Sequence, residues 1–227
     1  MVQAVRLDGV ILTPPLCDSP EILEGLEAAQ VAYVRLSPDG DQDRSSLVYI
    51  DDQAAAFDMT MALIKMGHSQ IGFIKGDPTH GASRRRFAGY LQALQACGTA
   101  FRPELACEGD FSFRSGHTAA QGLFGLTPPP TAIFASNDDM ALGVLAAAGK
   151  AGIAVPEHLS VAGFDDSPGA RIVWPQLTTI RQPNAEMAAA AVDILVDQST
   201  AKPGEARVRT LLDFQLIARE TTAIRHL

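Results

Sequence analysis

Short apolar segments of strand length alternate with amphipathic segments of helical length along almost the whole chain. The run at 70–76 precedes a helical pattern at 84–97, and the run at 132–136 precedes another at 138–149. Buried strands appear in a sequence as such apolar runs, and helices connect them as crossovers. The alternation therefore predicts an α/β protein with parallel sheets and right-handed crossovers.

Residues at the ends of the amphipathic segments support these boundaries. Ser19 is a candidate N-cap with Pro20 in the first helical position, and Gly67 is placed to end the helix predicted at 52–66. The other predicted helices are 19–30, 114–124 and 184–198, and the other predicted strands are 7–12, 31–36, 47–50, 104–107, 159–164, 177–180 and 214–219.

The composition excludes several classes of protein. A net charge of −8 argues against a chain that holds a nucleic-acid backbone by itself, because such modules are usually basic. No apolar stretch approaches the roughly 18 residues of a membrane span, and no signal peptide is visible at Met1. Cys17, Cys97 and Cys107 lack the spacing of metal ligands and fit buried thiols in a reducing compartment. We therefore expect a cytoplasmic protein without a metal or other cofactor.

Polar side chains directly follow two of the predicted strands. Asn137 comes after the run at 132–136, and Asp165 comes after the run at 159–164. Ligands of an open parallel α/β sheet bind beyond the carboxyl ends of the strands, so we expect both side chains to face the same opening. An amide and a carboxylate together suit vicinal hydroxyl groups, and each charge-assisted hydrogen bond contributes about 1.5–3 kcal/mol.

A structural role is the alternative for each of these positions. Asp138 and Asp139 would lie in the first turn of a helix, which favours acids, and Asn137 would be an ordinary N-cap. Asp165 and Asp166 would form a plain turn in the sequence DDSPG. The residues alone leave both interpretations open.

Arginines and an aromatic side chain also follow predicted strands. The three arginines at 84–86 cannot share one helical face, so at most two can point inward. Arg84 and Arg86 could be these two, and Arg85 is expected to face solvent. Phe111 is a candidate floor beneath the apolar face of a sugar. Surface salt bridges for the arginines and core packing for Phe111 are the alternatives.

Six motifs resemble those of one known family. They are VYIDD, LIKMGHSQIGFIKG, SRRRFAGYLQAL, AIFASNDDMALGVLAAAGKAGIAVPEHLSVAGFDDSP, PQLTTIRQP and LIARETTA. They occur in the order and spacing of the lactose-repressor (LacI/GalR) family of bacterial transcription regulators, and the resemblance covers about residues 7–223. No single motif is decisive, but six motifs in register are specific.

The resemblance implies a periplasmic-binding-protein-like fold with two Rossmann-like parallel-sheet lobes. The expected N-terminal lobe comprises 1–49 plus 183–210, and the expected C-terminal lobe comprises 50–182 plus 211–227. The N-terminal lobe would be incomplete, because residues 7–12 match its third strand, and the family's helix-turn-helix head has no counterpart here. We therefore interpret the chain as a truncated form or the product of a late start, unable to bind operator DNA by itself and with an unpaired edge at its first strand.

The resemblance also implies an effector site in the cleft between the lobes. Arg86 matches the Arg of the family's R-x-x-G motif, Asn137 the Asn of its N-D motif, and Asp165 the first Asp of its G-F/Y-D-D motif. Ser37 stands where the family often has Asp, which is a departure from the pattern. The full set of ligand-binding residues that the resemblance implies is Arg84, Arg86, Asn137, Asp165, Phe111, Gln182 and Ser37.

Together these features predict the effector-sensing region of a LacI-type transcription regulator, with no catalytic residue. The small-molecule effector is expected to be a sugar rather than a purine. A homodimer is expected to form partly through the apolar segment 171–175, for which packing within the same chain is the other interpretation. Operator DNA would be a partner only through the missing head, and no membrane contact is expected.

Two other functions are disfavoured. A periplasmic sugar-binding protein of a transport system shares the two-lobed fold, but the motifs LTTIRQP and ARETTA argue against it. An enzyme is disfavoured because G-x-S-x-G, P-loop and H-E-x-x-H motifs are absent, and His68 is expected to have a structural role.

Overall fold

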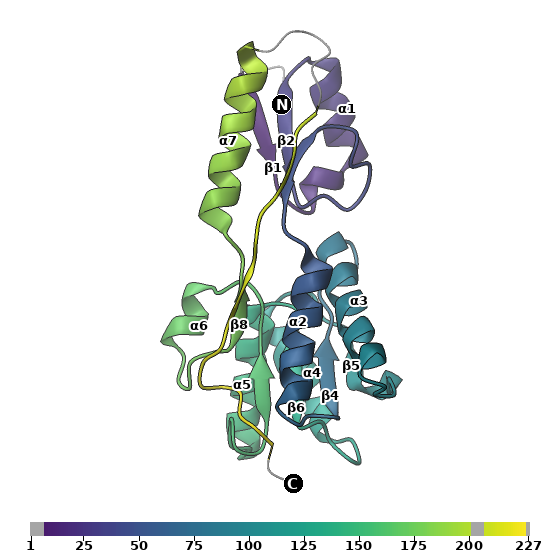
Figure 1. The fold of residues 1–227 in the computed structure, drawn as a ribbon, viewed down its shortest axis with the longest axis vertical. Coiled ribbons are helices and arrows are strands. Elements are labelled where there is room, and N and C mark those ends of the chain that lie inside the picture. The colour runs from purple at the N-terminus through teal and green to yellow at the C-terminus, as the bar shows by residue number, and fades with distance from the viewer. Residues whose placement is uncertain (1–6, 201–206, 226–227) are drawn as a thin grey trace. The chain divides into compact units, whose positions relative to one another are not determined.

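The protein consists of two compact units, each built around a parallel sheet. The computed structural model describes residues 7–200 and 207–225 of the chain. Unit 1 comprises Met1–Asp51, Thr79–Gly81 and Pro183–Asp213, and unit 2 comprises Asp52–Pro78, Ala82–Gln182 and Phe214–Leu227. Helices pack against the sheet of each unit (Figure 1), which confirms the α/β class predicted from the sequence.

Unit 1 contains a four-stranded parallel sheet. Its strands, in hydrogen-bonded order, are β1 (Gly9–Leu12), β2 (Ala32–Leu36), β3 (Ser46–Tyr49) and β9 (Arg209–Leu211). Its helical elements are the 3-10 turn η2 (Leu16–Asp18), α1 (Pro20–Ala28) and α7 (Asn184–Thr200). Helix α7 packs on β1, β2 and β3, and α1 packs on β2. Leu23, Leu26 and Val34 are among the buried side chains of this core.

Unit 2 contains a second parallel sheet that is buried at its centre. The strands, in hydrogen-bonded order, are β5 (Ala106–Cys107), β4 (Ile71–Ile74), β6 (Ala132–Ala135) and β7 (Ser160–Ala162). A separate antiparallel pair consists of β8 (Thr179–Arg181) and β10 (Gln215–Ile217). The helical elements of unit 2 are α2 (Asp52–Lys65), α3 (Gly81–Ala96), η3 (Pro103–Leu105), α4 (Phe113–Phe124), α5 (Asp138–Ala151) and α6 (Pro168–Ile172).

Close packing of α4 against α5 depends on two glycines. A Cβ atom on Gly116 would lie 2.2 Å from the carbonyl oxygen of Met140, and one on Gly143 would lie 2.2 Å from the carbonyl oxygen of Phe113. Any larger residue would push the helices apart, because backbone atoms cannot move aside.

Elsewhere in unit 2, the rings of Phe73 and Phe134 meet edge to face, with centroids 5.3 Å apart. Across the described residues, no helix is both long and apolar enough to cross a membrane.

The structure differs from the sequence-based boundaries in a few places. Helix α3 begins at Gly81 rather than at residue 84, and Ser19 occupies the N-cap of α1 without a capping hydrogen bond from its side chain. Only the last two residues of the strand predicted at 104–107 form β5. Helix α6 and strand β9 were not predicted, because five and three residues are too few to show a periodic pattern.

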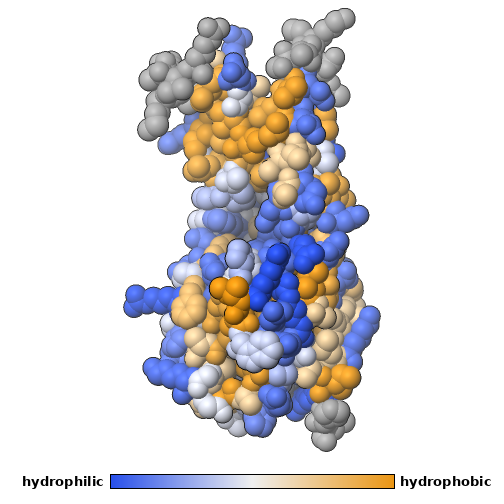
Figure 2. Space-filling model, turned by 90° about the vertical axis from the view of Figure 1, so that its left-hand side faces the viewer, coloured by the Kyte–Doolittle hydropathy of each residue, from blue (hydrophilic) through white to orange (hydrophobic). Residues whose placement is uncertain are grey.

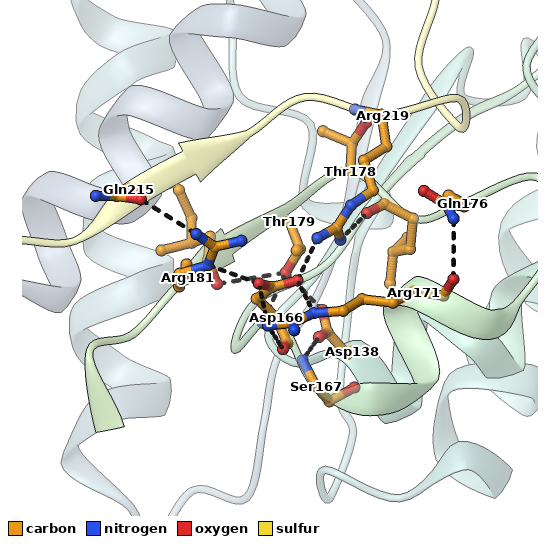
Figure 3. Close-up of polar contacts among 12 residues, drawn as sticks. Asp138, Asp166, Ser167, Arg171, Gln176, Thr178, Thr179, Arg181, Gln215 and Arg219 are labelled. Carbon is orange, nitrogen blue, oxygen red and sulfur yellow. Dashed lines mark hydrogen bonds and ion pairs between the residues drawn. The ribbon is translucent and has the colours of Figure 1, made fainter. Parts of the chain in front are cut away.

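Asp138 has a structural role at the start of α5 (Figure 3). Its side chain is fully buried. Its Oδ1 accepts a hydrogen bond from Thr179 Oγ1 (2.6 Å), and its Oδ2 accepts one from the backbone N–H of Ser167 (2.7 Å). The carboxyl group thereby joins α5 to β8 and to the segment after β7. Burial raises the pKa of Asp138 to about 7, against the opposing effect of these two hydrogen bonds.

We expect unit 2 to lose stability as the pH rises through the range in which Asp138 loses its proton. Because its pKa of about 7 lies above the ordinary value, the folded state holds this proton more tightly than the unfolded state. The contribution is complete below about pH 4 and lost by about pH 7, and it amounts to about 2–4 kcal/mol. Urea unfolding followed by circular dichroism should show a smaller fall in the unfolding free energy of Asp138→Asn than of the wild type over this range.

Asp139→Asn is the matched control, since Asp139 is the adjacent acid and is exposed. It should retain the pH dependence of the wild type. Identical pH profiles for the wild type and Asp138→Asn would contradict the assignment.

Candidate functional site

Three of the predicted site residues come together at the carboxyl edge of the sheet of unit 2. Asn137 lies just beyond β6, which ends at Ala135, and the carbonyl oxygen of the intervening Ser136 accepts a hydrogen bond from Arg86 Nη1 (2.6 Å). The same Nη1 atom lies 3.8 Å from Oδ1 of Asp165, beyond the end of β7. Strands β6 and β7 are parallel neighbours, so both polar segments leave the sheet at the same edge.

Arg86 is held in place by Asp52 and Phe164. The residue is buried, with 5% of its surface exposed, and its Nε donates to Asp52 Oδ1 at 2.8 Å. Its guanidinium group lies over the ring of Phe164, 3.5 Å from the centroid. Asp52 is also buried, and removing one partner of such a pair costs about 3–5 kcal/mol because the other charge is left uncompensated.

Asp52 was missed as a candidate in the sequence. The available signal was its position: it is the last residue of the motif VYIDD, lies shortly after the end of β3 and begins helix α2. An acid there is readily taken for a residue that complements the helix dipole. Its role as the partner of Arg86 depends on packing between α2 and α3, which the sequence does not reveal.

The expected orientation of Arg85 is corrected by the structure. Arg85 was expected to face solvent, but its Nη2 lies 3.4 Å from Asp52 Oδ2, and only 26% of its side chain is exposed. Arg84 is exposed, and its Nη1 donates to the carbonyl oxygen of Pro78 (2.8 Å), so its contact with a ligand stays a prediction. The turn of α3 that buries Arg86 therefore brings Arg85, and not Arg84, onto the same carboxylate.

Asp165 presents a partly exposed carboxylate between an amide and a guanidinium group. Oδ1 accepts a hydrogen bond from Gln182 Nε2 (2.6 Å), and 31% of the side chain is exposed. Burial raises the pKa of this carboxyl to about 6, while Arg86 and Gln182 act to lower it. Carboxylate, amide and guanidinium together offer the donors and acceptors that a polyhydroxylated ligand needs.

Asn137 caps helix α5, as the structural alternative proposed. Its Oδ1 accepts a hydrogen bond from the backbone N–H of Met140, and its Nδ2 donates to the carbonyl oxygen of Phe111, both at 2.9 Å. The amide has one further N–H and one further lone pair for a ligand. Its contact with Phe111 also fixes the loop after β5.

The ring of Phe111 lies against the backbone at the end of β4. A Cβ atom on Gly76 would lie 2.0 Å from the ring, so only glycine fits there. Phe111 has a positive φ of 66° and packs partly against the core of unit 2. The ring therefore has the core contact that the alternative interpretation predicted, and its role beneath a ligand stays a prediction.

Ser37 belongs to unit 1, where it follows β2. It has a positive φ of 46°, and its backbone N–H donates to the carbonyl oxygen of Val48 (2.9 Å). The buried Arg35 fixes the loop that begins there, donating to the carbonyl oxygen of Gly40 (3.1 Å) and to Ser45 Oγ (2.9 Å). A ligand contact at Ser37 stays a prediction.

His68 has the structural role that was expected of it. Nδ1 is 3.0 Å from Thr131 Oγ1 and Nε2 is 3.2 Å from the carbonyl oxygen of Ala223. Burial lowers the pKa of His68, and the ring joins two loops of unit 2 through these contacts.

Comparison with known proteins begins with the sequence. Residues 60–222 match the family model described as a periplasmic binding protein-like domain. Over 175 residues, which is 77% of this chain, the sequence is 41% identical to the HTH-type transcriptional repressor CytR of Escherichia coli (strain K12). The chain spans about half the length of that relative, 51%.

Solved structures of transcriptional regulators are also similar. One is a complex of the transcriptional regulator CelR with cellobiose, which is 34% identical in sequence and has a TM-score of 0.88. The match covers 94% of this chain and 65% of the CelR chain. A LacI transcriptional regulator from Bacillus cereus subsp. cytotoxis is 30% identical, with a TM-score of 0.90 over 99% of this chain and 79% of its own. The motifs, the fold and these relatives agree: the chain belongs to the LacI/GalR family of bacterial transcription regulators, with the periplasmic-binding-protein-like fold of that family.

Proposed function

We propose that this chain is the effector-sensing region of a LacI-type regulator and that its effector is a small sugar-like molecule. The observation that carries the proposal is the carboxylate of Asp165, which is partly exposed between Gln182 Nε2 (2.6 Å) and Arg86 Nη1 (3.8 Å). Units 1 and 2 would correspond to the N-terminal and C-terminal lobes of the family.

The chemistry of the residues favours a polyol over a flat aromatic ligand. An ionised carboxylate accepts hydrogen bonds from two adjacent hydroxyl groups, and a guanidinium group donates to a third oxygen. Asn137 and Phe111 add an amide and an aromatic edge at the same end of the sheet. The name of one structural relative, a CelR–cellobiose complex, supports a carbohydrate.

In the intact regulator the effector would act by shifting a conformational equilibrium. It can shift that equilibrium only by its difference in affinity for the two states, about 5.5 kcal/mol for a shift from 1:99 to 99:1. DNA would be bound by a head domain outside this chain. The curated relatives are transcriptional repressors, which weighs against the alternative of a periplasmic protein that feeds a transporter.

An exposed apolar surface at the end of α6, formed by Ile172 and Trp174 and called the α6 face here, supports a dimer. Ile172 and Trp174 are 84% and 79% exposed, so the alternative that this segment packs within its own chain is wrong for these two side chains. They border a groove of about 540 Å³ that also includes Phe113, Leu142 and Leu145. Figure 2, which faces the side on which α6 lies, shows apolar residues grouped there among polar ones. A second copy of the chain would cover this face through a two-fold interface.

We expect Asp165→Asn to weaken sugar binding. The substitution keeps the size of the side chain but removes the charge that strengthens its hydrogen bonds, and the loss of one such bond is worth about 1.5–3 kcal/mol, or about 10- to 150-fold in affinity. Calorimetric titration of the intact regulator and of this chain with cellobiose, followed by a panel of mono- and disaccharides, measures the change. Asp58→Asn, at an exposed acid of α2, is the control with the same loss of charge. Unchanged affinity in Asp165→Asn would remove the proposed site.

We expect Trp174→Glu to convert a dimer into a monomer. A charge in the middle of an apolar interface is left without water or a partner when the second copy docks. Sedimentation velocity should show a dimer for the wild type and a monomer for the variant. Ile224→Glu is the control, because Ile224 is 67% exposed and lies outside the α6 face. A variant that dimerises as the wild type does would contradict this interface.

A further inference from the structure

We propose that Asp166 is a positioning residue of the effector site, which holds the carboxylate of Asp165 in place by gathering three arginines around its own side chain (Figure 3). This inference rests on the proposed function, in which Asp165 contacts the effector. Asp166 was not among the ligand-binding residues expected from the sequence, where a plain turn in DDSPG was its structural alternative.

The backbone around Asp165 needs an external constraint. Asp165 has φ of 120° and Asp166 has φ of 54°, so two consecutive residues with side chains adopt positive φ values. Such conformations cost about 1–3 kcal/mol each and persist only where the surroundings impose them. Without that constraint, Asp165 would relax to a conformation in which its carboxylate points elsewhere.

The side chain of Asp166 supplies a strong constraint. It is fully buried, and its Oδ2 accepts hydrogen bonds from Arg171 Nη2 and Arg181 Nε, both at 2.7 Å. Its Oδ1 accepts one from Arg219 Nη2. Burial favours the neutral form, but the three arginines outweigh it and lower the pKa of Asp166 to about 2. The residue is therefore ionised throughout the neutral range.

The three arginines come from three separate parts of unit 2. Arg171 lies on α6, Arg181 ends β8, and Arg219 follows β10. Arg219 is itself anchored, since its Nη1 donates to the carbonyl oxygen of Leu177 (2.8 Å). One carboxylate thus holds three segments that would otherwise repel one another through their like charges.

Strand β8 connects this cluster to the effector site. Arg181 contacts Asp166, and the next residue, Gln182, donates to Asp165 Oδ1 at 2.6 Å. The backbone N–H of Asp165 donates to the carbonyl oxygen of Ile180 (2.7 Å). Asp165 and Asp166 are therefore held against the consecutive residues Ile180, Arg181 and Gln182 at the end of β8. Asp165 is held through its backbone N–H and the amide of Gln182, and Asp166 through its ion pair with Arg181.

The first test measures the position of Asp165 without any ligand. In the wild-type chain, the side-chain amide of Gln182 should show slow hydrogen exchange and a shifted NMR resonance, because it is bonded to Asp165. In Asp166→Asn this exchange should become about tenfold faster, since the acceptor moves away. Asp166→Glu should restore part of the protection, and Asp58→Asn should leave it unchanged. A role confined to stability would lower the melting temperature of Asp166→Asn and leave the Gln182 signal as in the wild type, which would overturn the proposal.

Two further variants cover the case in which Asp166→Asn does not fold. Arg171→Gln and Arg181→Gln each remove one of the three arginines, whose side chains are 57% and 42% exposed. Each variant should speed up hydrogen exchange of the Gln182 side-chain amide, but by less than Asp166→Asn does. If both variants exchange this amide at the wild-type rate, the proposal is overturned.

The second test uses cellobiose as the probe. Asp166→Asn should weaken its binding to the intact regulator about tenfold, in parallel with the Gln182 signal. Loss of the Gln182 protection without any loss of cellobiose affinity would show that Asp165 is positioned as inferred but is not the effector carboxylate. In that case the proposed function fails and the positioning of Asp165 stands.

Discussion

Parallel pairing of β4, β6 and β7 determines where the polar side chains of unit 2 meet. Because these strands run in the same direction, the segments that follow them leave the sheet at one edge. Asn137 and Asp165 are placed there by the ends of β6 and β7, and Arg86 is brought to the same edge from α3. The strands are buried on both faces, so the edge is the part of the sheet where polar groups can face a ligand.

The acids near this edge differ in charge state because they have different partners. Asp138 is surrounded by neutral donors, so burial prevails and its pKa rises to about 7. Asp166 is equally enclosed, but three arginines reverse the effect of burial. Asp165, with one arginine at 3.8 Å and one amide, lies between these cases, and of the three it has the most exposed carboxylate. Burial alone therefore does not determine the charge state of these acids; the type of partner does.

Local patterns in the sequence were enough to predict the fold class and part of the candidate site. Apolar runs identified the strands around 70–76 and 132–136, and the residues that follow strands identified Asn137 and Asp165. The pairing of Arg86 with Asp52 and the gathering of Arg171, Arg181 and Arg219 were beyond such patterns, because they join positions separated by up to 53 residues. These contacts depend on how helices pack and on how far long side chains reach, and neither leaves a periodic signal. The solvent-facing orientation expected for Arg85 was wrong for the same reason.

The last described segment of the chain has a consequence for how the protein is made. Strand β9 completes the sheet of unit 1, and in unit 2 the backbone of Thr221 accepts a hydrogen bond from Val161 of β7 (2.8 Å) while its hydroxyl donates to the carbonyl oxygen of the same residue (2.7 Å). Both units therefore depend on residues that are synthesised after the other strands of their own sheets. Domains encoded by one continuous stretch can fold in turn during synthesis, whereas a ribosome stalled before Arg209 would carry two open sheets at once, each a target for chaperones.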